Sequence, residues 1–211
     1  MKIAMNPVRT VARWGVLAAL FCLAAALSSA HLAGDEKHEQ RGASRKQSDQ
    51  FSDIELYTQH GERVHFYQDL VKDKTVIINL MYSGCGLTCP ANSAELAMIN
   101  DLLGPRMGRD IVMLSLSIDP IADTPERLKA YWQAFGAKPG WLFLTGKPAD
   151  IARLRHELGA YDLDPVVDAD PTQHSGAITV GNDRTDRWTA LPLLMSRPQL
   201  LGTILRMSRD G

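Results

Sequence analysis

The sequence predicts a layered α/β domain in which a central mixed, largely parallel sheet is flanked by helices. The β-branched run Val76-Ile77-Ile78 is typical of a strand that is buried on both faces of a sheet. Downstream of it, strand-like and helix-like apolar patterns alternate along the chain, as they do in α/β layered folds. Two cysteines, Cys85 and Cys89, follow the first buried run and precede a helical pattern. Function is therefore expected at this strand-to-helix turn.

The first 50 residues are expected to lie outside the folded domain. Residues 1–30 combine a basic start, an apolar stretch at 15–27 and small residues that end at Ala30, which is the pattern of a secretory signal peptide. The apolar stretch is short for a spanning helix, but retention of residues 10–30 as an inner-membrane anchor stays open. Residues 31–50 are charged and polar and predict a flexible spacer. We therefore expect an exported, periplasmic protein whose domain covers residues 51–211.

The charge balance argues against a nucleic-acid partner. The chain has 23 Lys and Arg residues against 24 Asp and Glu residues, for a formal net charge of −1. Binding to nucleic acid calls for a basic face, and the sequence shows no basic surplus. The function is expected to depend on the chemistry of the cysteine turn instead.

The first half of the domain is predicted as a hairpin, the buried strand and a helix. Apolar residues alternate on both sides of Gln59-His60-Gly61, which indicates an N-terminal β-hairpin. Residues 91–103 carry apolar side chains at helical spacing, and Gly104-Pro105 ends that helix. Pro90 is expected at its first helical position, where proline is favoured.

The second half continues the alternation of strands and helices. A strand over residues 111–118 is closed by Asp119-Pro120, and Thr124 is predicted to cap the next helix with Pro125 at its first position. Further strands are expected at 141–144 and 177–180, further helices at 148–158 and 199–207, and a loop at 161–173.

The two cysteines are predicted to be a working pair rather than a structural bridge. Cys22 lies in the leader, so the exported chain keeps only Cys85 and Cys89, and the small loop between them would contribute little stability as a disulfide. At a helix start, free N–H groups and the helix dipole favour thiolate over thiol. A cysteine pair between a central strand and a helix indicates a thioredoxin-like arrangement, although the usual redox motif has two intervening residues and this chain has three.

Two thiolates and one imidazole would suit copper, because thiolates select Cu(I) and imidazole accepts either oxidation state. Structural zinc usually takes four protein ligands, so copper is favoured over zinc. His174, in a loop before the strand at 177–180, is the candidate third ligand; the plain alternative is a loop histidine that caps a turn. The remaining histidines are placed in the spacer, in the hairpin or among polar residues on a helix: His31, His38, His60, His65 and His156.

Three phrases make the sequence resemble the Sco/SenC family of copper-binding, thioredoxin-like assembly factors of cytochrome c oxidase. They are CGLTCP at 85–90, SIDPIADTPERL at 117–128 and QHSGAITVGND at 173–183, and the resemblance runs from about residue 51 to 202. It implies that Cys85, Cys89 and His174 bind copper. The family usually has proline and aspartate between the cysteines, where this chain has Gly86 and Leu87, and this departure puts the standard partner in doubt more than copper binding.

Two functions stay open at this point. The first is a metallochaperone, a carrier rather than an enzyme, which passes copper to a respiratory copper enzyme such as the CuA domain of cytochrome c oxidase. The second is a thiol–disulfide oxidoreductase that uses Cys85 and Cys89 as a redox pair to reduce the cysteines of a copper site, itself served by a thiol reductase partner. A thiol peroxidase ranks lower, because the Trp-Asn-Phe phrase of the glutathione peroxidases is absent.

Other polar and sulfur-containing residues receive structural interpretations. Asp119 is expected to form a turn, although it could lie near the metal, and Asp123 is expected mainly to complement the dipole of the helix that follows. Met81, Met98 and Met195 are expected to fill the core rather than bind copper.

Overall fold

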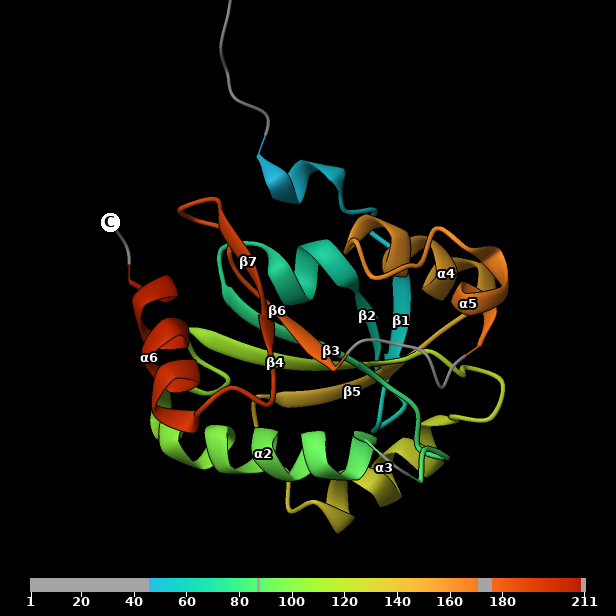
Figure 1. Cartoon of the computed structure of the whole chain (residues 1–211), viewed down its shortest axis with the longest axis horizontal. Helices are drawn as coiled ribbons and strands as arrows, with labels where there is room; N and C mark the ends of the chain where they lie inside the picture. The colour runs from blue at the N-terminus through green and yellow to red at the C-terminus, as the bar shows by residue number, and fades with distance from the viewer. Residues whose placement is uncertain (1–45, 87, 171–175, 210–211) are drawn as a thin grey trace, which may run out of the picture. The chain divides into compact units, whose positions relative to one another are not determined.

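A computed structural model describes residues 46–86, 88–170 and 176–209, which belong to one compact unit that starts at Lys46. Seven strands form one sheet in the order β2-β1-β5-β4-β3-β6-β7 (Figure 1). Their bounds are β1 Glu55–Thr58, β2 Arg63–His65, β3 Thr75–Met81, β4 Ile111–Ser117, β5 Trp141–Thr145, β6 Ala177–Asn182 and β7 Arg187–Pro192. The helices of the described residues are α2 Thr88–Leu103, α3 Pro125–Ala134, α4 Pro148–Glu157, α5 Pro165–Ala169 and α6 Arg197–Met207, with the short turns η1 Gln47–Gln50, η2 Phe66–Val71 (a π-helix) and η3 Gly104–Arg106.

Helices cover both faces of the sheet, and this explains the uninterrupted apolar runs. Every residue of β4 is buried, and β3 is buried except for Leu80. On one face Ile77 packs in a core with α2, α3 and α6, while on the other face Ile78 packs in a core with η2 and α4 (Figure 1). A strand covered on both sides has no solvent-facing side, so apolar residues dominate its sequence, and the buried Ser115 hydroxyl donates to Asn79 Oδ1 inside the sheet.

The predicted thioredoxin-like class with a mixed sheet is confirmed. The parallel strands form the centre of the sheet. Strands β3, β4 and β5 run parallel, whereas β1 pairs antiparallel with β2 and β5, and β6 pairs antiparallel with β3 and β7. In the β3–β4 pair, Met81 lies opposite Ser117, so both strands end at the same edge of the sheet. The cysteine turn begins at that edge.

Three local predictions need correction. Helix α2 begins at Thr88, so Pro90 is its third residue rather than its first; the first turn tolerates this because its N–H groups have no intrahelical partner. The expected loop at 161–173 contains α5, whose start is capped by Asp164, which accepts a hydrogen bond from the Val166 N–H at 2.9 Å. Strand β7 was not anticipated, because its burial is mixed and shows no clean alternation.

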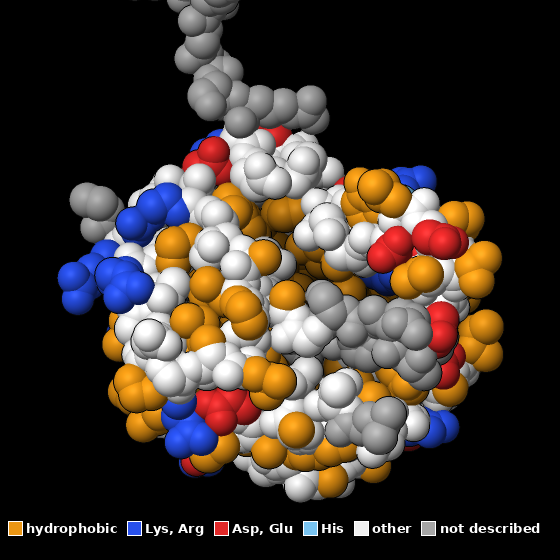
Figure 2. All heavy atoms as spheres, in the orientation of Figure 1, with side chains coloured by type: hydrophobic (Ala, Val, Ile, Leu, Met, Phe, Trp, Pro, Cys, Tyr) orange, Lys and Arg blue, Asp and Glu red, His pale blue; other side chains and the backbone are white. Residues whose placement is uncertain are grey.

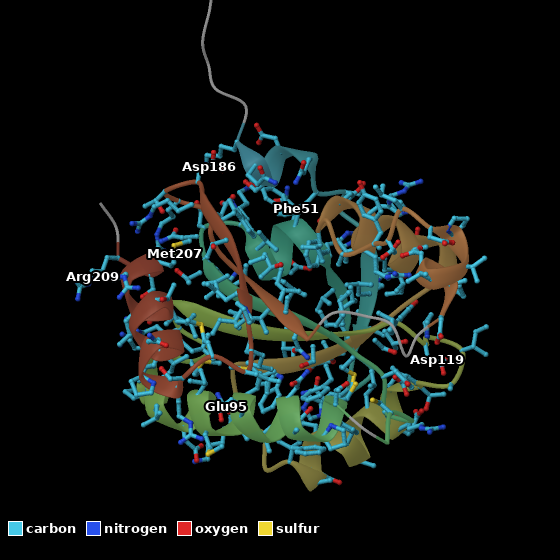
Figure 3. All side chains as sticks on the ribbon, viewed as in Figure 1. Phe51, Glu95, Asp119, Asp186, Met207 and Arg209 are labelled. Carbon is cyan, nitrogen blue, oxygen red and sulfur yellow. The ribbon has the colours of Figure 1, made fainter. Side chains whose placement is uncertain are left out.

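The compact unit starts five residues before the boundary expected from composition. The Ser48 hydroxyl donates to the buried carboxylate of Asp183, and the Gln47 N–H donates to Asp186 Oδ1 at 2.8 Å. Figure 3 labels Asp186 where the β6–β7 turn meets this segment. The last residues of the expected spacer, from Lys46 on, are therefore part of the folded unit. Across the described ranges, we find no helix with both the length and the apolar character needed to cross a membrane.

Candidate metal and thiol site

The two cysteines lie close together in the connection between β3 and α2. After Met81 the chain turns, and the Cys85 N–H donates to the Tyr82 carbonyl oxygen at 3.2 Å. Cys85 is 8% exposed and Cys89, the second residue of α2, is 2% exposed. Neither cysteine is in a disulfide, and both side chains join the core beneath α2.

The spacing of three residues lets the first sulfur cap the helix. The Cys89 N–H donates to Cys85 Sγ at 3.4 Å, and Thr88 Oγ1 lies 4.0 Å from the same sulfur. An N–H in the first turn has no intrahelical acceptor, so Cys85 supplies one much as a capping serine would. The turn therefore directs Cys85 Sγ at the backbone of Cys89.

Burial dominates the acidity of Cys89 and corrects the expectation that the helix start favours its thiolate. Loss of solvation raises the pKa of the Cys89 thiol to about 11, and the hydrogen bond and charge of Cys85 act in the same direction. Hydrogen bonds from the Tyr82 backbone and the Thr88 hydroxyl lower the pKa, but they are outweighed. Desolvation penalises the charged form of any thiol, and Cys89 lies inside the core rather than in front of the helix.

Two phenols flank the thiols. Burial raises the pKa of Tyr131 to about 12, and the charges of both cysteines and of Asp123 act in the same direction; its hydroxyl lies 3.0 Å from Ser93 Oγ. Burial also raises the pKa of Tyr82, helped by a hydrogen bond with the Cys85 side chain. Two aromatic rings with polar hydroxyl groups thus lie beside the thiols.

Sequence reasoning missed the role of Asp123. Its carboxylate is fully buried, accepts from the Ser83 N–H at 3.0 Å and from the Ser117 hydroxyl at 2.6 Å, and also accepts from the Ser83 hydroxyl. The expected helix-dipole role therefore understates it. The expected cap is Thr124, whose side chain accepts from the Arg127 N–H at 3.4 Å.

Asp119 forms a turn, as expected. Its Oδ1 accepts from the Ala122 N–H at 3.3 Å, and its own N–H donates to Ser117 Oγ at 3.1 Å. Figure 3 shows it in the loop that follows β4. Its proposed closeness to a metal stays a prediction.

His174 lies outside the described residues, but described residues before and after it lie near the cysteine turn. Strand β6 runs antiparallel to β3, so its start lies beside the end of β3. A Cβ placed on Gly176 would lie 3.6 Å from Asn92 Nδ2, one helical turn beyond Cys89. On the other side, the charge of Asp170 contributes to the raised pKa of Tyr82.

The histidines that the structure describes make contacts elsewhere. His65 Nδ1 lies 3.4 Å from Asp53 Oδ2, the His60 ring meets Trp132 edge-on, and His156 stacks on Tyr161. Within the described ranges, no three His, Cys, Asp or Glu side chains gather as a metal site. The structure therefore brings together two of the three predicted ligands.

The methionines divide between core and surface. Met81 is buried and Met195 packs partly buried against the same core. Met98 is 39% exposed, so its predicted role as core filler is wrong. It lies on the outer side of α2, which an apolar residue can occupy without penalty to the fold.

A separate cavity of about 250 Å³ lies away from the cysteines, with Phe51, Leu158 and Trp188 in its lining. These side chains belong to the core on the face of the sheet opposite α2. Figure 2 shows the corresponding hollow among apolar side chains beneath η1, and Figure 3 labels Phe51 there. None of its lining residues is a predicted ligand.

Comparison with known proteins identifies the family of the chain. The family model SCO1/SenC matches residues 42–207. A protein of Stutzerimonas stutzeri named as a putative copper-binding protein is 28% identical, and the match covers 62% of this chain and 63% of that protein. The SCO2-like protein RC0895 of Rickettsia conorii is 32% identical, and the match covers 47% of this chain and 46% of that protein. The chain thus spans less than two thirds of the length of these relatives. The copper-bound structure of Bradyrhizobium japonicum ScoI is 25% identical, with a TM-score of 0.60 over 74% of this chain and 98% of that one. The chain therefore belongs to the SCO1/SenC family.

Proposed function

We propose that the protein is a copper metallochaperone that carries copper on Cys85, Cys89 and His174 and delivers it to a respiratory copper enzyme, such as the CuA domain of cytochrome c oxidase. The observation that carries the proposal is the pair of reduced, buried thiols linked by the 3.4 Å hydrogen bond from the Cys89 N–H to Cys85 Sγ. Family membership and the copper bound by ScoI of Bradyrhizobium japonicum support copper as the cargo.

The donor set fits a soft ion. Two sulfur ligands favour Cu(I) over hard cations, and an imidazole would extend the site to Cu(II). The antiparallel start of β6 and the closeness of Gly176 to Asn92 support His174 as the third ligand. Because a thiol must lose its proton to bind, copper uptake should release protons and strengthen as the pH rises.

The exposure of the two thiols suggests how cargo would leave. Cys85 is 8% exposed and Cys89 only 2%, and the exposed glycines Gly84 and Gly86 flank Cys85. An incoming ligand from a recipient protein would thus reach Cys85 first, and Cys89 would release the ion last. The low coordination number of Cu(I) permits such stepwise exchange.

Thiol–disulfide exchange is the second candidate, because the two reduced thiols lie close enough in the turn to form a disulfide. In that reaction the Cys85 thiolate attacks a partner disulfide and releases one partner thiolate. The Cys89 thiolate then attacks Cys85 Sγ, which releases the second partner thiolate and leaves the Cys85–Cys89 disulfide. A thiol reductase would be needed to reduce that disulfide. His174 has no part in this sequence, so it separates the two functions.

Export to the periplasm, with residues 1–30 as signal peptide or inner-membrane anchor, is part of the same proposal. It is supported by the basic start and apolar stretch of that segment. A copper enzyme of a respiratory membrane would then be accessible to the carrier.

The deciding experiment compares His174→Ala with wild type and with His65→Ala, whose ring is exposed and paired with Asp53. Reduced protein is loaded with Cu(I) or Cu(II), passed over a mild chelating competitor and analysed for metal and for the thiolate-to-Cu(II) absorption band. A carrier should lose most Cu(II) binding in His174→Ala, keep part of its Cu(I) binding through two sulfurs, and be unchanged in His65→Ala. Wild-type protein that retains neither ion would refute copper carriage and leave thiol exchange as the function.

A further inference from the structure

One buried carboxylate, Asp123, is bound to both elements that lead to the cysteine turn. Its side chain is fully buried and accepts the Ser83 N–H at 3.0 Å and the Ser117 hydroxyl at 2.6 Å, with the Ser83 hydroxyl as a further donor. Arg127, whose side chain is half exposed, lies on its outer side with Nε 3.8 Å from Asp123 Oδ1. A buried carboxylate is retained in a fold only where donors replace its water.

The donors of Asp123 mark two strand ends. Ser117 is the last residue of β4 and lies opposite Met81, the last residue of β3. Ser83 follows two residues after Met81, inside the turn that the Cys85 N–H closes on the Tyr82 carbonyl. Both hydrogen-bond donors of Ser83, its N–H and its hydroxyl, bind the one carboxylate, so Asp123 holds the backbone two residues before Cys85.

We infer that Asp123 is a positioning residue for the cysteine pair, which it acts on through Ser83 by holding the turn that presents Cys85 Sγ to the Cys89 N–H. The inference rests on the proposed function only in taking the two thiols as the working groups. It assigns Asp123 no contact with copper and no transfer of a proton. The guanidinium of Arg127, which also lies beside Gly84, covers the same turn from outside.

A matched carboxylate at the other end of the sheet shows what a purely structural role would look like. Asp183 is also buried and also accepts from a serine hydroxyl, that of Ser48, and from a backbone N–H, that of Asp73 at 2.8 Å. It follows Asn182, which pairs with Thr75 at the start of β3, whereas the cysteine turn follows the end of β3. Loss of Asp183 should weaken the fold without reaching the thiols.

Asp123→Asn would keep the shape of the side chain but replace one of its two acceptor oxygens with an NH₂ group. The Ser83 N–H, the Ser83 hydroxyl and the Ser117 hydroxyl would then compete for one carbonyl oxygen, and the turn before Cys85 would loosen. The structure holds the turn with both cysteines reduced, so a looser turn removes a restraint on the reduced geometry and favours the disulfide. We expect the equilibrium constant for oxidation of the pair to rise about tenfold, which lowers its potential by about 30 mV for a two-electron couple.

The test measures this equilibrium in the full chain for wild type, Asp123→Asn, Ser83→Ala and Asp183→Asn. Each protein is equilibrated in dithiothreitol buffers of graded potential, trapped by alkylation and analysed by peptide mass spectrometry, which separates Cys85 and Cys89 from Cys22. Urea unfolding of each variant is measured in parallel. The absorption band of Cu(II)-loaded protein gives a second signature of sulfur placement.

We expect the constant to change about tenfold in Asp123→Asn, about threefold in Ser83→Ala, and less than twofold in Asp183→Asn despite its lower unfolding midpoint. A constant unchanged in Asp123→Asn, or changed equally in Asp183→Asn, overturns the inference. If Asp123→Asn does not fold, Ser83→Ala decides, and an unchanged constant there overturns it. Wild type that binds no copper would refute the proposed cargo but leave this comparison readable.

Discussion

The protonated state of Cys89 should make the reduced protein lose stability in alkali, and Cys89→Ser should remove that loss. Burial raises the pKa of this thiol from 9.0 to about 11. A raised pKa in the folded state contributes stability below the unfolded pKa, and this contribution disappears as the pH climbs through the folded value. The relevant window therefore runs from about pH 9 to pH 11.

The size of the effect follows from the two pKa values. A difference of about two pKa units, at about 1.4 kcal/mol per unit, corresponds to about 3 kcal/mol of unfolding free energy. The side chain is 2% exposed, so solvent does little to screen this energy. Against a typical domain stability of about 5–15 kcal/mol, such a loss is readily measured.

The assay is urea unfolding of the full chain in reductant, followed by tryptophan fluorescence at pH values from 7 to 11.5. Other groups titrate in this range, so the measured quantity is the difference between wild type and Cys89→Ser. That difference should shrink by about 2 kcal/mol between pH 9 and pH 11, because one of the two titrations is only half complete at each end of this window. Oxidised wild type, in which neither Cys85 nor Cys89 has a thiol to ionise, is the second control. Parallel curves for reduced wild type and Cys89→Ser would refute the reasoning.

Three further predictions concern single contacts elsewhere in the domain and beside the site. Tyr131→Phe removes the hydroxyl that lies 3.0 Å from Ser93 Oγ and should cost about 1 kcal/mol in urea unfolding at neutral pH; an unchanged midpoint would contradict it. Arg197→Ala breaks a partly exposed pair with Glu95, whose two contacts are 2.7 and 2.8 Å, and should cost at most about 1 kcal/mol, less in 1 M salt; a larger loss that salt leaves unchanged would contradict it. Gly181→Ala would place a methyl group 2.1 Å from the Trp188 ring and should destabilise by about 1–3 kcal/mol, with a shifted tryptophan emission; full stability would show that the ring moves freely.

The sequence allowed the framework of the fold to be predicted because the relevant signals are local. The buried run of β3 and the Thr124 cap can each be recognised within a few neighbouring residues. Strand β7 escaped because an edge strand with mixed burial has no periodic signature. Helix α5 escaped because its five residues are too few for a helical pattern to show.

The sequence allowed the candidate ligands to be predicted. It did not reveal the carboxylate that holds the cysteine turn or the acidity of the thiols. Asp123 precedes a helix in the sequence, and nothing local shows that Ser83, 40 residues away, meets its carboxylate. The acidity of Cys89 was misjudged because a helix start is visible in the sequence, whereas burial beneath the core is a property of the fold. Desolvation then outweighed the helix dipole.

The raised pKa of Cys89 bears on the choice between the two functions. Disulfide exchange needs a thiolate, and a thiol with a pKa of about 11 is almost wholly protonated at neutral pH, so Cys89 would resolve a mixed disulfide slowly. Metal binding meets the same proton but replaces it with a soft cation, which supplies the charge that the buried sulfur lacks. A buried, protonated thiol beside a more accessible one therefore suits a carrier, which must hold its ion firmly at one sulfur and offer it at the other. The same pair, without metal, would act as a slow thiol reductant.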